Sequence, residues 1–74
     1  MDRRYGLCRL DNLKAQRIAA GKSVNWLART SLVSDVIINT LEHAPVGGTC
    51  TEAEAGRIAA ALGVSLVELG QALL

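Results

Sequence analysis

The chain contains 74 residues, of which half are apolar and 3% are aromatic, and its formal net charge is +1. This length is enough for one small domain, and the composition favours an aliphatic, helical core. We expect no membrane partner, because the sequence has no run of about 18 apolar residues. The charged first ten residues are unlike a signal peptide, so we expect a cytoplasmic protein.

The charges are divided unevenly along the chain. Residues 1–30 carry seven basic and two acidic side chains, whereas residues 31–74 carry one basic and five acidic side chains. A polyanion would be attracted to the first half, and the second half would face away from it or face another protein. Small helical domains also acquire such a division by chance, so charge alone leaves both interpretations open.

Residues 1–9 lack a helical period, and we expect an N-terminal basic tail or arm here, beside a domain that spans residues 10–74. Tails of this kind usually fray. An arm can instead lie along phosphates or reach a DNA groove, as arms of some DNA-binding domains do. The basic residues of this segment are Arg3, Arg4 and Arg9.

The first predicted helix begins at Asp11, whose side chain can accept a hydrogen bond from a free backbone N–H at the helix start. It should run to about Ala20 and end at Gly21, which tolerates the left-handed conformation found at helix ends. Its buried side is formed by Leu10, Leu13, Ala15, Ile18 and Ala19.

Two short helices joined by a tight turn are predicted between residues 23 and 43. Ser23 can cap the first of these helices, and Ser34 can cap the second. Apolar residues at three- and four-residue spacing give the two helices one shared core edge, which indicates a helix-turn-helix. These residues are Trp26, Leu27, Ala28, Val33, Ile37, Ile38 and Leu41.

The segment from Ala44 to Thr49 has the composition of a turn. Pro45 ends the preceding helix, and Gly47 and Gly48 allow close approach to a neighbouring element. The backbone N–H groups of the two glycines can in principle meet a phosphate, but a simple flexible turn is the favoured interpretation.

Two capping boxes predict the last two helices. Thr51 and Glu54 open a helix that ends at Gly63. Ser65 and Glu68 open a final helix, which runs from residue 66 to about residue 72.

Three segments resemble the lambda-repressor-like (XRE-type, Cro/repressor) helix-turn-helix family. Gly21 to Ala44 fits the pattern G-x-S-x-x-x-L-A-x-x-x-x-V-S-x-x-x-I-x-x-[IL]-E without a gap. Arg17, four residues before Gly21, resembles the end of the family's first helix, and RIAAALGVSLVEL, from Arg57 to Leu69, resembles its closing segment. The resemblance covers residues 10–70 and implies an all-α, five-helix DNA-binding domain with a central helix-turn-helix.

This resemblance implies that the second helix of the motif reads bases in the major groove. Asn39 can bond adenine at N6 and N7, Asp35 can accept from cytosine N4, and Val36 can contact a thymine methyl group. The expected base contacts are Ser34, Asp35, Val36 and Asn39. The expected contacts to the DNA backbone are Lys22, Ser23, Asn25, Arg29, Thr40 and His43.

Two structural features also follow from the resemblance. An arginine at the place of Arg17 pairs with a glutamate near the end of the second motif helix, here Glu42, and the two side chains fit as a planar fork. Family members often dimerise through the C-terminal region, and the last helix is apolar on more than one side, so we expect a homodimer. Its interface would be Leu66, Val67, Leu69, Leu73 and Leu74, and the alternative is a monomer that is disordered beyond Gly70.

The sequence departs from the family at the recognition face, where Asp35, Val36 and Ile37 replace polar or basic residues and Val24 replaces a glutamine that touches phosphate. Leu32 replaces the glycine of the turn, so we expect the turn to adopt another conformation. Two functions are therefore considered. The first is a small sequence-specific double-stranded DNA-binding transcriptional regulator. The alternative is a protein-interaction or anti-repressor module that does not bind DNA.

The sequence predicts no catalytic site, cofactor or metal. Cys8 and Cys50 are expected to be ordinary reduced thiols. Together with His43 they would supply three zinc ligands, but a fourth is missing and the spacing fits no known zinc site. No nucleophile lies at a readable spacing from the histidine, and no glycine-rich phosphate loop follows a strand, so we do not expect an enzyme.

Overall fold

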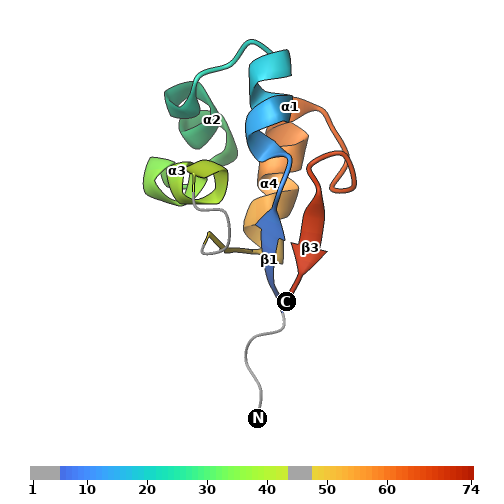
Figure 1. Cartoon of the computed structure of the whole chain (residues 1–74). Helices are drawn as coiled ribbons and strands as arrows, with labels where there is room; N and C mark the ends of the chain where they lie inside the picture. Colours follow the sequence, from blue (N-terminus) through green and yellow to red (C-terminus); the bar gives the residue numbers. More distant parts are fainter. Residues whose placement is uncertain (1–5, 44–47) are drawn as a thin grey trace.

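The structure is a computed structural model, which describes residues 6–43 and 48–74. Within these residues the chain forms four helices and three strands, a mixed α/β fold (Figure 1). The prediction of an all-α domain with five helices is therefore wrong. In chain order the elements are β1 (Leu7–Leu10), α1 (Leu13–Ala19), α2 (Val24–Ser31), α3 (Asp35–His43), β2 (Cys50–Thr51), α4 (Glu52–Leu62) and β3 (Gln71–Leu73).

The three strands form one antiparallel sheet with the order β2-β1-β3, so β1 is its central strand. Cys8 pairs with Cys50 on one side of β1, and Leu10 pairs with Gln71 on the other. The side chains of β1 alternate between half-buried and buried, with Cys8 and Leu10 inward. Residues 7–9, which the sequence analysis assigned to a tail or arm, thus contribute to this strand. Arg3 and Arg4 lie outside the described residues, as do Pro45 and Gly47 of the predicted turn.

The predicted final helix is absent, and its residues form one turn followed by β3. The Ser65–Glu68 capping box is present, since Ser65 N donates to Glu68 Oε1 over 2.8 Å and Glu68 N donates to Ser65 Oγ over 3.0 Å. The turn nevertheless does not continue into a helix, because Gly70 has a left-handed φ of 72°. Asn12 N then donates to Leu69 O over 2.9 Å, and the last residues pair with β1. The sheet pairing therefore replaces the helical hydrogen bonds.

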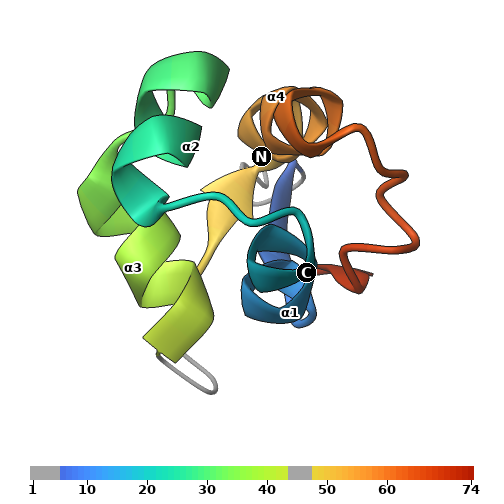
Figure 2. The same cartoon turned by 90° about the horizontal axis from the view of Figure 1, so that it is seen from above.

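The core contains one large aliphatic side chain from each part of the fold. Figure 2 shows α2 and α3 side by side, with α1 and α4 on the other side of the molecule. The largest fully buried apolar side chains are those of Leu10, Leu13, Leu27, Ile38, Ile58 and Leu69. They come in turn from β1, from α1 to α4 and from the turn before β3, so a single aliphatic core holds the sheet and the helices together.

Helix starts follow the predicted caps at three of four positions. Ser23 accepts from Trp26 N over 3.0 Å, Ser34 accepts from Val36 N over 3.1 Å, and Thr51 and Glu54 form the expected capping box. Asp11 does not cap α1, which begins after Asn12 without a side-chain cap. Its carboxylate lies 3.2 Å from Arg9 Nε, at the end of β1. The longest helix of the described residues, α4, has 11 residues, and none is long and apolar enough to cross a membrane.

The two cysteines face each other across β1 and β2. Their sulfur atoms are 3.9 Å apart, and Cys8 is 0% and Cys50 3% exposed. The Gln71 side chain donates from Nε2 to Cys8 Sγ over 3.7 Å. Burial, together with the neighbouring Cys8, raises the pKa of the Cys50 thiol from its ordinary value of 9.0 to about 12.

This raised pKa predicts a loss of stability at alkaline pH. Between pH 9 and about 12 the unfolded chain loses the Cys50 proton while the folded chain keeps it, so rising pH favours unfolding. With both thiols kept reduced, the urea midpoint should fall more steeply from pH 8 to pH 10.5 for the parent chain than for Cys50→Ala. Parallel pH profiles for the two proteins would contradict this assignment, because the two chains differ only in the side chain of residue 50.

Candidate nucleic-acid interface

The turn between α2 and α3 is held by Ser31 and by a left-handed leucine. Ser31 Oγ donates to Leu27 O over 2.6 Å and accepts from Val33 N over 3.3 Å, and Val33 is buried in the core. Leu32 has φ 60° and ψ 32°, the left-handed conformation that glycine usually supplies. The turn therefore has the conformation that a glycine would give it, and the expectation that Leu32 forces a different turn conformation is wrong. The Leu32 side chain is 78% exposed, and its left-handed backbone has an intrinsic cost of about 1–2 kcal/mol.

Replacing Leu32 with glycine should raise the free energy of unfolding by about 0.5–1 kcal/mol. The left-handed strain disappears, and the greater entropy of the unfolded glycine chain offsets only part of this gain. Leu32→Ala is the matched control, since it removes the exposed side chain but keeps the Cβ atom that causes the strain. Urea unfolding should separate the two variants, and an equal or lower stability of Leu32→Gly than of Leu32→Ala would contradict the prediction.

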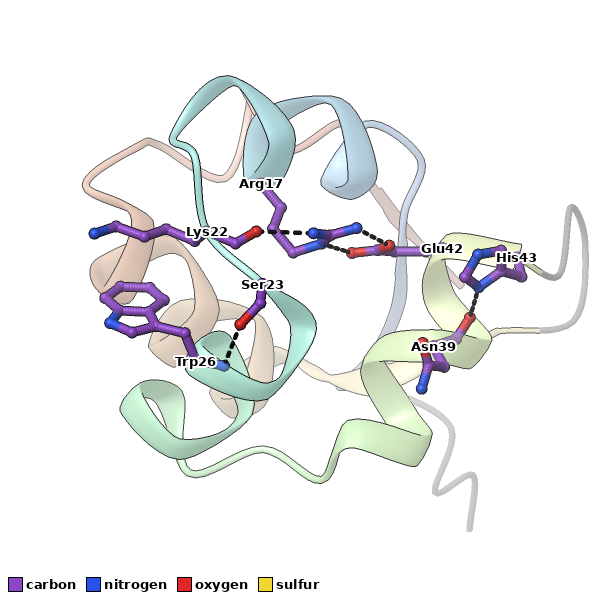
Figure 3. A network of polar contacts seen from close by, with 7 residues as sticks. All are labelled: Arg17, Lys22, Ser23, Trp26, Asn39, Glu42 and His43. Carbon is purple, nitrogen blue, oxygen red and sulfur yellow. Dashed lines mark hydrogen bonds and ion pairs between the residues drawn. The ribbon is translucent and has the colours of Figure 1, made fainter.

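A buried fork joins α1 to the end of α3. Arg17 Nε lies 2.6 Å from Glu42 Oε2, and Arg17 Nη2 donates to Glu42 Oε1 over 2.9 Å (Figure 3). Arg17 Nη1 also donates to Lys22 O over 2.8 Å, just before α2. The two side chains are 13% and 0% exposed, and the hydrogen bond to Glu42 raises the pKa of Arg17. The ion pair expected between these residues is thus present, and its guanidinium is committed to protein partners.

The exposed residues of α3 all lie on one face of the helix. This recognition face consists of Asp35, Val36, Asn39, Thr40 and His43, which follow one another at spacings of one and three residues. Ile38 and Leu41 lie on the opposite side of α3 and are buried in the core. The structure therefore brings the expected base-contact residues of α3 together with Thr40 and His43 on a single exposed surface, and Ser34 lies at its start.

Several polar groups of this face are positioned by hydrogen bonds to the helix itself. Thr40 Oγ1 donates to Val36 O over 2.8 Å. His43 Nδ1 lies 3.0 Å from Asn39 O, and because a carbonyl oxygen only accepts, this nitrogen carries the proton (Figure 3). The second ring nitrogen of His43, Nε2, is then left for another partner. Asp35 occupies the first turn of α3, where a negative charge is favourable at a helix N-terminus.

The expected contacts to the DNA backbone from α2 lie at its start and along one side. Asn25 and Arg29 are both exposed and four residues apart, so they are neighbours on the helix surface. Lys22 Nζ lies 4.6 Å from the centre of the Trp26 ring, which restricts its position beside the α2 N-terminus. The Glu42 charge is neutralised by Arg17. The remaining charged residues between positions 22 and 43 are Lys22, Arg29 and Asp35, which together have a net charge of +1.

Sequence reasoning missed the role of Arg57. Its Nε donates to Ser31 O over 3.0 Å, which satisfies a carbonyl at the C-terminus of α2 from a side chain on α4. The two residues are 26 positions apart, and no pattern in the sequence connects them. This contact fixes the end of α2, and hence the turn that leads into α3, against the rest of the domain.

The five residues expected at a dimer interface do not form one surface. Leu69 is 0% exposed in the core, and Leu66 is half-buried against it. Val67, Leu73 and Leu74 are 87%, 64% and 56% exposed. The reason is that the final helix is absent. The side chains of strand β3 point in other directions than they would on a helix that continued from residue 66.

Comparisons with known proteins returned no relative of this chain. No protein-family model matches it, and comparisons with curated proteins and with solved structures gave no match either. Among residues 6–43 and 48–74, no group of three histidine, cysteine or acidic side chains is arranged to hold a metal ion. His43 lies on the exposed face of α3, whereas Cys8 and Cys50 lie buried in the sheet.

Proposed function

We propose that this chain is a small sequence-specific double-stranded DNA-binding transcriptional regulator that acts in the cytoplasm, with α2 and α3 as a repressor-like helix-turn-helix. The observation that carries the proposal is the recognition face of α3, which is exposed along its whole length while Arg17 and Glu42 hold the helix to the core. An exposed helix of this kind fits the major groove, and the preceding helix then crosses the DNA backbone.

The chemistry of the recognition face supplies three kinds of base contact. The Asn39 amide can bond an adenine with two hydrogen bonds, and the Val36 methyl groups, on a side chain that is 68% exposed, can contact a thymine methyl group. The Asp35 carboxylate can accept from cytosine N4. The Ser34 hydroxyl already accepts from Val36 N, so its own proton is left to donate to a base or a phosphate.

Phosphate contacts in the proposal come from the start and one side of α2 and from the later part of α3. Lys22 precedes the Ser23 cap of α2, Arg29 lies in the last turn of α2, and Asn25 lies on the same side as Arg29. Thr40 and His43 lie further along α3, and each must release its hydrogen bond to the helix backbone before it can donate to a phosphate. These groups position the helix without reading sequence, so their removal should weaken all DNA sites alike.

Single substitutions test this division of roles. Asn39→Ala should lose discrimination at one base pair, a cost of about 1–3 kcal/mol, and leave binding to an unrelated duplex unchanged. Lys22→Ala and Arg29→Ala should weaken binding to every duplex and reduce the salt slope of log K by about one each. Lys14→Ala, on the exposed surface of α1, is the matched control and should leave the slope unchanged. Equal effects of all four variants on both duplexes would contradict the proposal.

The proposal includes a homodimer, which would place two recognition helices about 34 Å apart, one turn of DNA. β3 is an outer strand of the sheet. The exposed Leu73 ends it, Leu74 follows it, and the exposed Val67 lies in the turn that precedes it. Light scattering at tens of micromolar is the direct test. The mass of two chains supports the dimer, and the mass of one chain contradicts it.

A second candidate function is a helix-turn-helix fold used as a protein-interaction or anti-repressor module without DNA binding. It is favoured by one specific observation, the exposure of Leu32 and Val36 near the acidic Asp35 at the start of α3. Apolar side chains beside a negatively charged carboxylate fit a protein partner better than the negatively charged phosphates of DNA. Val36→Ser and Leu32→Ser should then weaken capture of a protein partner while DNA binding is undetectable in the parent chain.

A further inference from the structure

The two buried thiols are placed for a covalent bond between β1 and β2. Cys8 and Cys50 are direct partners in the antiparallel register, and both are free thiols with sulfur atoms 3.9 Å apart. Residues directly opposite in an antiparallel pair have Cα atoms about 4.5–5.5 Å apart, within the range of about 4.4–6.8 Å that a disulfide spans. The sulfur atoms therefore need only side-chain rotation to reach the disulfide bond length of about 2.05 Å.

We propose that Cys8 and Cys50 form a redox-active pair, which a low-molecular-weight disulfide oxidises to a cross-strand disulfide that locks the sheet. This inference rests on the sheet alone and does not depend on the proposed DNA-binding function. Gln71 supports the arrangement, since its Nε2 donates to Cys8 Sγ from the opposite strand and leaves the Cys8 proton free to face Cys50.

The reaction begins at Cys50. This residue lies on β2, a two-residue strand at one edge of the sheet, whereas Cys8 lies on β1 between both neighbouring strands. Local opening of β2 therefore exposes Cys50 first, and exposure removes the burial that holds its thiol protonated. The closed sheet protects both thiols, so the rate of oxidation follows the opening of β2.

The exchange is balanced in atoms and electrons. The Cys50 thiolate attacks one sulfur of the small disulfide, forms a mixed disulfide and releases one small thiolate. The Cys8 thiolate then attacks Cys50 Sγ, so the protein S–S bond forms, the mixed S–S bond breaks and a second small thiolate leaves. The protons lost by Cys8 and Cys50 pass to the two released thiolates, so the small disulfide is reduced to two thiols.

Oxidation would close a loop that contains α1, α2 and α3. The two cysteines are 42 positions apart, so the bond removes much of the conformational freedom of the unfolded chain. β1 and β2 are already paired in the folded chain, so little native rearrangement opposes this gain. The oxidised chain should therefore melt more than about 10 °C above the reduced chain.

The test uses the full chain, incubated natively at pH 8 with oxidised glutathione or with dithiothreitol. Intact mass, thiol alkylation and thermal melting are then measured. The expected product is a monomer that has lost two hydrogens, contains no alkylatable thiol and melts at the higher temperature, and dithiothreitol should reverse all three changes. Cys8→Ala should stop at one glutathione adduct on Cys50, and Cys50→Ala should react more slowly, because β2 opening does not free Cys8.

Three results would overturn the proposal. The first is that both thiols of the parent chain stay alkylatable after prolonged native incubation. The second is a product made of persistent glutathione adducts or of disulfide-linked chains. The third is an intramolecular disulfide that leaves the melting temperature unchanged or lower. The reduced and oxidised parent chains are compared without any substitution, so the test is decisive even where a cysteine variant fails to fold.

Discussion

Glu42→Gln should lower the free energy of unfolding by about 3–5 kcal/mol, because it removes one partner of a buried ion pair and leaves the other charge uncompensated. The Glu42 carboxylate is fully buried, and it is the only carboxylate that Arg17 contacts among residues 6–43 and 48–74. A small domain has only about 5–15 kcal/mol of total stability, so this substitution should remove a large part of it. Thermal melting should show a decrease of more than about 10 °C.

The exposed pair of Arg9 and Asp11 provides the matched control. These side chains are 34% and 55% exposed, and surface pairs of this kind contribute about 0–1 kcal/mol. Asp11→Asn should therefore leave the melting temperature nearly unchanged. Equal melting temperatures for Glu42→Gln and the parent chain would show that the fork is not a stabilising contact between α1 and α3.

Gly48→Ala should lower the free energy of unfolding by about 1–3 kcal/mol through overpacking against α3. A Cβ atom on Gly48 would lie 2.5 Å from Thr40 O and 2.8 Å from Leu41 Cα. Both are backbone atoms of the helix that carries the recognition face, so the clash requires a shift of α3 or of residue 48 itself. Chemical denaturation gives the size of the effect.

Gly56→Ala is the matched control, and it should change stability in the opposite direction. Gly56 lies inside α4, and a Cβ atom there meets nothing within 4 Å. Alanine is favoured over glycine in a helix interior by about 0.8–1.0 kcal/mol. A stable Gly48→Ala variant, or two variants that change stability in the same direction, would contradict the close approach of residue 48 to α3.

Features that depend on a few neighbouring residues could be predicted from the sequence. The caps by Ser23 and Thr51 and the helices that follow them are local, because a side chain and an N–H group three residues away decide them. The face of α3 follows from its apolar period in the same way. Asp11 is not a cap, because the N–H groups of Asp11 and Asn12 donate to Gly70 O and Leu69 O, contacts that no helical pattern indicates, and α1 begins only at Leu13.

The sheet could not be predicted because its strands are short and its pairing is distant in sequence. β1, β2 and β3 have four, two and three residues, too few to show an alternating pattern. Ser65 and Glu68 form their capping box, but Gly70 ends the chain's single turn there, so no fifth helix forms. The pairing of Cys8 with Cys50 follows from the register of this sheet, and therefore it was also missed.

The most direct test of the central claim is fluorescence anisotropy of a labelled duplex from upstream of the chain's own gene, beside an unrelated duplex. If Lys22 and Arg29 each neutralise one phosphate, affinity should fall about 10-fold between 50 and 200 mM salt for one protomer, and about 100-fold for a dimer. The upstream duplex should bind more tightly at both salt concentrations. No binding to either duplex at low salt would contradict a DNA-binding function and favour a protein partner for the recognition face.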